Sequence, residues 1–175
     1  MKVTYYVASS LDGYIAKEDG DVSWLDELEM SIEESGYEDY FATVDALVMG
    51  RKTYKFLYDY GAWPYGNKPI WVCSSSPIDV VDGCNLQNAS NPNDVAMEAN
   101  ELGIDHLWLV GGGVLAAAFI KNKLLTHLII SQMPIILGSG IKLFAELEEP
   151  IKVRRQRVHE PKLGFSQLEF EIEYA

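Results

Sequence analysis

Two periodicities of apolar residues divide the chain into predicted strands and helices. Apolar and polar residues alternate in residues 2–9, and again in residues 151–159 and 165–174, which is typical of strands. Because a Pro-Lys-Leu-Gly turn (161–164) joins the last two stretches, we predict an antiparallel hairpin at the end of the chain. Short apolar runs predict buried strands at residues 46–49, 69–73, 106–110 and 127–133.

Helical spacing of apolar residues occurs between these strands. An i, i+3, i+4, i+7 pattern places four apolar residues on one helix face: Tyr37, Tyr40, Phe41 and Val44. Asn91 followed by Pro92 predicts the start of a helix that Gly103 ends, and further helices are predicted over residues 51–58 and 114–121. Since most strands alternate with helices, we expect a three-layer α/β/α fold with a mostly parallel central sheet and an antiparallel C-terminal hairpin.

The composition indicates one soluble domain. Its 175 residues suit a single domain, residues 1–175, and 48% of them are hydrophobic. The formal net charge of −12 argues against non-specific binding to nucleic acid or to an anionic membrane surface. No apolar run reaches the ~18–20 residues of a membrane-spanning helix, and the first residues lack a signal-peptide layout, so we expect a cytoplasmic protein. Cys73 and Cys84 make neither a disulfide framework nor a four-ligand zinc site, and we expect no metal.

A glycine-rich turn between a predicted strand and a predicted helix is the strongest local signal. Residues 107–116 read Leu-Trp-Leu-Val-Gly-Gly-Gly-Val-Leu-Ala. Glycines let the backbone approach a phosphate, and a helix start offers unpaired N–H groups with positive partial charge. The Rossmann version of this pattern has an acidic residue at the end of the next strand, and residues 130–133 contain none. Residues 111–113 therefore either bind a phosphate in another way or form a tight turn without a ligand.

Two other predicted strand ends carry groups that bind anions. Residues 48–54 again run from a strand through a glycine into a helix start with two basic residues and a hydroxyl: Gly50, Arg51, Lys52 and Thr53. The strand at 69–73 runs into three serines, including Ser74 and Ser75, which either bind a phosphate or make a turn. Because ligands of open α/β sheets bind outside the carboxyl ends of the strands, one ligand with several phosphates would explain all three places.

Four motifs in a fixed order resemble the dihydrofolate-reductase-like superfamily. They are residues 9–16 (Ser-Ser-Leu-Asp-Gly-Tyr-Ile-Ala), 50–54 (Gly-Arg-Lys-Thr-Tyr), 111–113 (Gly-Gly-Gly) and 134–144, which begin Pro-Ile-Ile-Leu-Gly-Ser-Gly and end Leu-Phe. Over nearly its whole length, the chain is most similar to the reductase domain of the bifunctional riboflavin-biosynthesis deaminase/reductase. The resemblance implies NADPH as cofactor and a homodimer. The open edge of the predicted C-terminal hairpin also favours a homodimer.

The resemblance also implies which residues bind the cofactor. NADPH would lie in an extended pose, with its phosphates at the three strand ends described above. The residues expected at the pyrophosphate and the 2′-phosphate are Gly50, Arg51, Lys52, Thr53, Ser74, Ser75, Gly111, Gly112, Gly113, Val114 and Leu115. Ala8 and Ile15 would flank the nicotinamide.

Three residues are the expected substrate contacts: Asp12, Trp24 and Ser131. Hydride transfer to a C=N or C=O group needs a proton, which a positioned acid with a raised pKa, or a water held by such an acid, can supply. Asp12, in the turn beside the expected nicotinamide, is the first candidate, and Glu29 and Asp26 are the second candidates. The alternatives are that Asp12 only shapes its turn, that Glu29 lies on a solvated face, and that Ser131 is a buried hydroxyl satisfied by the backbone.

These features predict an NADPH-dependent reductase of a pyrimidine- or pterin-like heterocycle. Reduction of 5-amino-6-(5-phosphoribosylamino)uracil in riboflavin biosynthesis is the activity that the resemblance implies. Dihydrofolate reduction is one alternative, although the segment that begins at Trp24 lacks the flanking prolines usual in dihydrofolate reductases. A non-catalytic NADPH-binding module is the other. Because the sequence lacks the deaminase half and its zinc motif, we expect no deamination.

Overall fold

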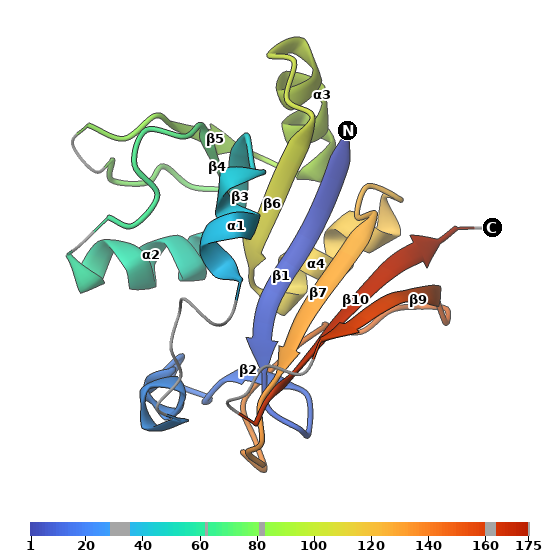
Figure 1. Ribbon diagram of the computed structural model, residues 1–175. Coiled ribbons are helices and arrows are strands. Elements are labelled where there is room, and N and C mark those ends of the chain that lie inside the picture. Colours follow the sequence, from blue (N-terminus) through green and yellow to red (C-terminus); the bar gives the residue numbers. More distant parts are fainter. Residues whose placement is uncertain (29–35, 62, 81–82, 160–163, 175) are drawn as a thin grey trace.

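The fold is built around an eight-stranded sheet with the order β5-β4-β3-β6-β1-β7-β10-β9 (Figure 1). The computed structural model describes residues 1–28, 36–61, 63–80, 83–159 and 164–174. The strands are β1 (Lys2–Ser9), β3 (Ala46–Gly50), β4 (Ile70–Cys73), β5 (Leu86–Ala89), β6 (His106–Gly111), β7 (His127–Gln132), β9 (Lys152–His159) and β10 (Ser166–Glu173). A separate two-stranded sheet pairs β2 (Tyr14–Ala16) with β8 (Ile141–Lys142).

The strands from β5 to β7 in this order are parallel to one another. Parallel neighbours need crossover connections, and helices lie in these connections except between β4 and β5, where the described residues form no helix. β10 runs antiparallel to β7, and β9 runs antiparallel to β10, so the last two strands form a hairpin at the sheet edge. The predicted α/β fold, with a mostly parallel sheet and an antiparallel C-terminal hairpin, is confirmed.

Helices cover both faces of the sheet. α1 (Tyr37–Ala42) and α2 (Arg51–Tyr60) pack on one face, and α3 (Pro92–Glu101) and α4 (Gly113–Lys121) pack on the other (Figure 1). The α1/α2 face is rich in aromatic rings, which gather around Trp108, whereas the α3/α4 face is largely aliphatic. Within the described ranges, no helix is long and apolar enough to cross a bilayer.

Most predicted elements are present, and the differences have local causes. α1 ends at Ala42, before Val44, because the chain tightens where the Thr43 N–H donates to the Tyr40 carbonyl. Val44 still packs in the same core as the helix. The short strands β2, β5 and β8 were not predicted, because their sequences show no alternation and only their pairing partners make them strands.

The edge strand β9 departs from its predicted pattern. All of its residues are exposed, although the sequence alternates there. Arg154 instead forms ion pairs with Glu171 (2.5 Å) and Glu173 (3.3 Å) on β10. β9 is the last strand in the order of the sheet, and no strand among the described residues pairs with its outer edge. An edge strand of this kind can pair with a strand of another chain.

A buried histidine, His106, begins β6 at the end of the sheet opposite to the carboxyl ends of the parallel strands. Its Nδ1 lies 3.0 Å from the Thr43 carbonyl oxygen, which can only accept, so this nitrogen carries the proton. Its Nε2 lies 2.9 Å from Thr4 Oγ1 and is left to accept a hydrogen bond. Burial lowers the pKa of His106, because it disfavours the charged imidazolium.

We expect the free energy of unfolding to fall as the pH drops below about 6.5, the ordinary pKa of histidine. The unfolded chain takes up a proton in that range, whereas folded His106 takes it up only at lower pH, so acid favours unfolding. Urea unfolding at pH 7.5 and 5.5 measures the difference. His106→Gln should lose part of this pH dependence and His159→Gln, on exposed β9, should keep it. An unchanged dependence in His106→Gln would contradict the prediction.

Candidate nucleotide and substrate site

The connections of the sheet change direction between β3 and β6. These two strands are parallel neighbours. The chain leaves β3 into α2 on one face and leaves β6 into α4 on the opposite face. In open parallel sheets such a point forms a crevice outside the carboxyl ends of the strands, where ligands bind. The candidate site is therefore at the lower end of β1, β3 and β6 in Figure 1.

Two helices begin at this point without a side-chain cap. α2 starts after Gly50 and α4 after Gly112, and a glycine has no side chain that could accept a bond from the first N–H groups. These N–H groups have no partner within the helix, and the aligned peptide dipoles add positive partial charge. The two helix starts therefore offer separate places for anionic groups of one ligand.

Three of the predicted cofactor segments meet at the glycine turn. A Cβ atom on Gly111 would lie 3.6 Å from Thr53 Oγ1, and one on Gly112 would lie 3.9 Å from the same oxygen. The Gly112 position is also 3.7 Å from Cδ1 of Ile15, which comes from β2. The peptide bond between the two glycines is cis. Since these are ordinary contact distances, the turn, the start of α2 and Ile15 line one place.

The third glycine of the turn, Gly113, packs closely against another segment of the backbone, unlike the first two. A Cβ atom on Gly113 would lie 2.3 Å from the carbonyl oxygen of Lys142 and 2.8 Å from that of Leu143. Gly113 is therefore needed for close packing of the chain and not for access of a ligand. Val114 is 76% exposed at the helix start, whereas the Leu115 side chain is buried in the core and only its backbone is left for a ligand.

Arg51 joins the start of α2 to the serine turn after β4. Its Nη1 donates to Ser74 Oγ (3.3 Å) and to the Pro77 carbonyl (3.3 Å). The Ser74 hydroxyl is used within its own turn, because it donates to the Ser76 carbonyl at 2.6 Å. Ser75 is exposed, as are Arg51 and Lys52 on α2. A phosphate here would meet the basic side chains and Ser75, while Ser74 shapes the turn.

The substrate residues expected beyond the nicotinamide position lie in one region. Ala8 on β1 is paired with Ser131 on β7, so their side chains share one face of the sheet. Trp24 comes from a 3-10 helix, η1 (Ser23–Leu28), and is buried in a small apolar cluster against which Ala8 packs. Its indole Nε1 has no hydrogen-bond partner in the part of the chain that the structure describes. Glu29, another predicted acid, lies outside the described residues.

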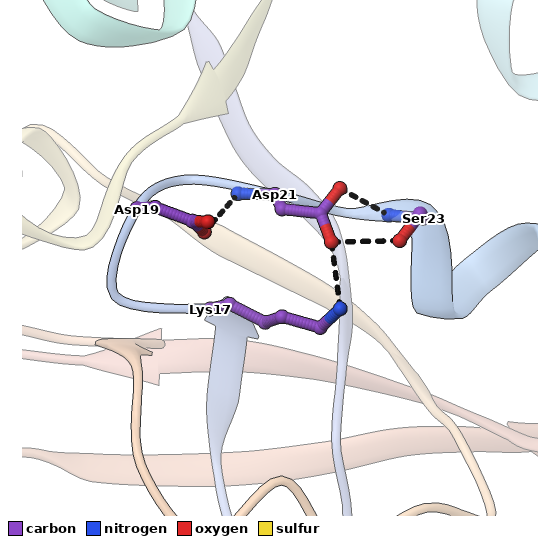
Figure 2. A network of polar contacts seen from close by, with 4 residues as sticks. All are labelled: Lys17, Asp19, Asp21 and Ser23. Carbon is purple, nitrogen blue, oxygen red and sulfur yellow. Dashed lines mark hydrogen bonds and ion pairs between the residues drawn. The ribbon is translucent and has the colours of Figure 1, made fainter.

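A polar network fixes the loop between β2 and η1 (Figure 2). The Asp21 carboxylate accepts hydrogen bonds from the Lys17 ammonium (2.7 Å), the Ser23 N–H (3.0 Å) and the Ser23 hydroxyl (2.6 Å). Asp19 in turn accepts from the Asp21 N–H at 3.0 Å. The Lys17 and Ser23 bonds lower the pKa of Asp21. The network therefore links the end of β2 to the start of η1, the 3-10 helix that contains Trp24.

Asp12 is held by the loop that follows β7. Its Oδ1 accepts from the Ser10 hydroxyl (2.6 Å) and the Leu137 N–H (3.1 Å), and its Oδ2 accepts from the Gly138 N–H (2.7 Å). The bond from Ser10, with help from the two backbone N–H groups, lowers the pKa of Asp12. The raised pKa expected of a direct proton donor is therefore not found at Asp12, and a water held by this acid stays the other predicted source of the proton. Asp12 ties two loops together as a carboxylate, and a part in catalysis stays a prediction.

Two buried polar residues that the sequence analysis did not single out adjoin Ser131. Gln167 on β10 is paired with Ser131 across the antiparallel ladder and donates a hydrogen bond to its hydroxyl. The same amide donates to the Tyr6 hydroxyl on β1. No local pattern could have found Gln167, because only the register of β10 against β7 brings it opposite Ser131.

The chain is similar to known proteins along most of its length. A family model described as the RibD C-terminal domain matches residues 1–164. The uncharacterized Bacillus subtilis (strain 168) protein YwjB is 38% identical over 155 residues, which cover 87% of this chain and 88% of that protein. The crystal structure of a Shewanella sp. PV-4 protein named for riboflavin biosynthesis matches with a TM-score of 0.87 at 30% identity, over 99% of this chain and 100% of that one.

A more distant neighbour extends the likeness of the fold. The Thermotoga maritima diaminohydroxyphosphoribosylaminopyrimidine deaminase/5-amino-6-(5-phosphoribosylamino)uracil reductase matches with a TM-score of 0.75. Its identity is 17%, and the match covers 98% of this chain and 56% of that one. At this identity the likeness shows a common fold and nothing about the reaction.

We expect Gly112→Ala and Gly113→Ala to have different consequences. Gly112 has a φ of −97°, and its nearest neighbours leave room for a methyl group, so the variant should fold and bind NADPH about tenfold more weakly. At Gly113 the methyl group would meet the Lys142 carbonyl, so stability should fall by about 1–3 kcal/mol. Thermal unfolding and NADPH titration measure the two effects. Unchanged NADPH affinity in a folded Gly112→Ala protein would mean that the turn serves packing alone.

Asp12→Asn should lower the melting temperature, and if Asp12 is the proton donor that the sequence predicts, turnover should also fall about 10²–10⁴-fold. An amide has one accepting oxygen, so it cannot accept from the Leu137 and Gly138 N–H groups as the two carboxylate oxygens do. Asp59→Asn, which changes an exposed carboxylate on α2, is the matched control. Turnover within about threefold of the unchanged protein, with the same pH profile, would make Asp12 a residue that only shapes its turn.

Proposed function

Because the chain belongs to the family of RibD C-terminal domains, we propose that it is an NADPH-dependent reductase of a pyrimidine- or pterin-like heterocycle. Within this class, the proposed reaction is the reduction of 5-amino-6-(5-phosphoribosylamino)uracil in riboflavin biosynthesis, carried out in the cytoplasm. The observation that carries the proposal is the meeting of two uncapped helix starts, a glycine turn and Arg51 at one edge of the sheet.

The chemistry of this edge suits NADPH in particular. The start of α4 and the glycine turn would hold the pyrophosphate through backbone N–H groups, with Thr53 beside them. The 2′-phosphate would lie at the start of α2, where Arg51 is held by the serine turn and Lys52 adds a second charge. NADH lacks the group that these residues would bind.

The proposed position of the cofactor also indicates where the substrate would bind. The nicotinamide, when bound, supplies a hydride and would lie beside Ala8 and Ile15. A planar heterocycle stacked on that ring would be bordered by Ser131 on β7 and by Trp24 on η1. The buried indole Nε1 of Trp24 is a donor that a bound heterocycle could satisfy. These groups orient the substrate and exclude water from the reacting atoms.

Titration of the protein with NADPH and NADH tests the cofactor assignment. Hydrogen bonds to a charged group contribute about 1.5–3 kcal/mol, so NADPH should bind at least about tenfold more tightly. Arg51→Gln should remove most of this preference, whereas Arg155→Gln on exposed β9 should retain it. Equal affinity for both cofactors would remove the basis of the proposal.

Oxidation of NADPH in the presence of single substrates tests the reaction. Turnover with 5-amino-6-(5-phosphoribosylamino)uracil supports the proposed activity. Turnover with dihydrofolate in its place would favour the folate alternative. NADPH binding without turnover of any pyrimidine or pteridine would identify a binding module.

We also propose that the protein acts as a homodimer that pairs through β9. Every residue of this edge strand is exposed, and two of its side chains, Val153 and Val158, are apolar. Light scattering at micromolar concentration should give twice the chain mass of 19.6 kDa. Val158→Asp should weaken the dimer, while Met97→Asp, at an exposed apolar position on α3, should not. A monomer mass for the unchanged protein would contradict the proposal.

A further inference from the structure

A buried hydrogen-bond network of three polar side chains links neighbouring strands of the sheet near the proposed substrate position. The Gln167 amide nitrogen lies 3.0 Å from the Tyr6 hydroxyl and 3.2 Å from Ser131 Oγ. The three residues come from β1, β7 and β10, and their exposed fractions are 9% for Tyr6, 4% for Ser131 and 8% for Gln167. Burying a polar group raises the free energy of the folded state unless the group is hydrogen-bonded, so a buried polar network of this kind suggests a function.

The direction of these bonds fixes what Ser131 can still do. Gln167 Nε2 donates to the Ser131 hydroxyl, so the Ser131 oxygen accepts in this bond. The hydroxyl also has one proton of its own, which it can donate to another group. At this buried position an acceptor on a ligand would satisfy that proton.

The position of Ser131 indicates which part of a ligand its hydroxyl would contact. Ser131 is paired with Ala8, and paired residues of neighbouring parallel strands point to one face with their backbones about 4.8 Å apart. It lies one residue before the end of β7, at the carboxyl edge that forms the candidate site. A ring stacked on a nicotinamide beside Ala8 would present its edge to Ser131.

We propose that Ser131 donates a hydrogen bond to a ring carbonyl oxygen of the substrate, and that Gln167 is a positioning residue that orients this donor. The inference rests on the proposed function and deepens it, because it commits the substrate to a heterocycle with a carbonyl group at the edge that faces β7. A site with a fixed donor rejects analogues that lack the matching acceptor, since the buried donor would stay unpaired.

Calorimetric titration of the NADP⁺-loaded protein with 5,6-diaminouracil, a pyrimidine with two ring carbonyl groups, tests the contact. Ser131→Ala should raise the dissociation constant of this probe about tenfold, which corresponds to one lost hydrogen bond, and should leave NADPH affinity unchanged. Ser131→Thr, which keeps the hydroxyl, should restore most of the affinity. Thr4→Val removes another buried hydroxyl from the same face, bonded to His106 at the other end of the sheet, and should not change probe binding.

A double-mutant cycle separates positioning from a general loss of packing. Gln167→Leu should weaken probe binding in the unchanged protein and should have no further effect when Ser131 is already alanine, because Gln167 acts through that hydroxyl. Equal effects of Gln167→Leu in both backgrounds would overturn the positioning role.

The outcomes also separate this inference from the proposed function. If the protein binds NADPH and the probe, and Ser131→Ala binds the probe equally well, the inference is wrong and the reductase proposal stands. If the protein binds NADPH but the probe binds neither with nor without cofactor, the inference is overturned. A protein that does not bind NADPH contradicts the proposed function, and titration of the probe without cofactor then decides whether Ser131 binds the ring.

Discussion

The contact between the start of α4 and the segment at residues 142–145 holds the candidate site together. The absence of a side chain on Gly113 lets the carbonyl oxygens of this segment lie against the helix start. The Ala145 N–H donates to the Gly113 carbonyl, and the Leu143 N–H donates to the Gly13 carbonyl in the turn after β1. One segment therefore contacts both the start of α4 and the turn after β1, and it couples their positions.

The local charge at this edge is opposite to the charge of the chain. The protein carries a formal net charge of −12, which repels anions at long range. Screening at physiological ionic strength limits that repulsion to about 8 Å. The helix starts after Gly50 and Gly112 act at contact distance, as does Arg51 at its serine turn. Backbone groups and one positioned guanidinium can therefore favour a phosphate on an acidic protein.

The sequence predicted those parts of the candidate site that are formed by residues adjacent in the chain. The turns at Gly50 and at residues 111–113 each depend on neighbours in the chain, so strand, glycine and helix start could be read together. The hydrogen-bond partners of Asp12 could not be predicted, because Gly138, whose N–H donates to its carboxylate, lies 126 residues away in the sequence. Gln167 was missed for the same reason, since its bond to Tyr6 spans 161 residues. Long-range register, and not residue type, decided both roles.

The two ends of the proposed site consist of different chemical groups. The proposed cofactor end consists of backbone N–H groups at helix starts, which many sequences can provide as long as the glycines remain. The proposed substrate end consists of side chains from β1, β7 and β10, such as Ser131 and Gln167, and β10 belongs to the C-terminal hairpin. If the proposed site is right, a substitution on the hairpin would change the substrate without disturbing the cofactor. A shared fold at low identity accordingly does not identify the substrate, because the side chains that would bind it can change while the fold stays the same.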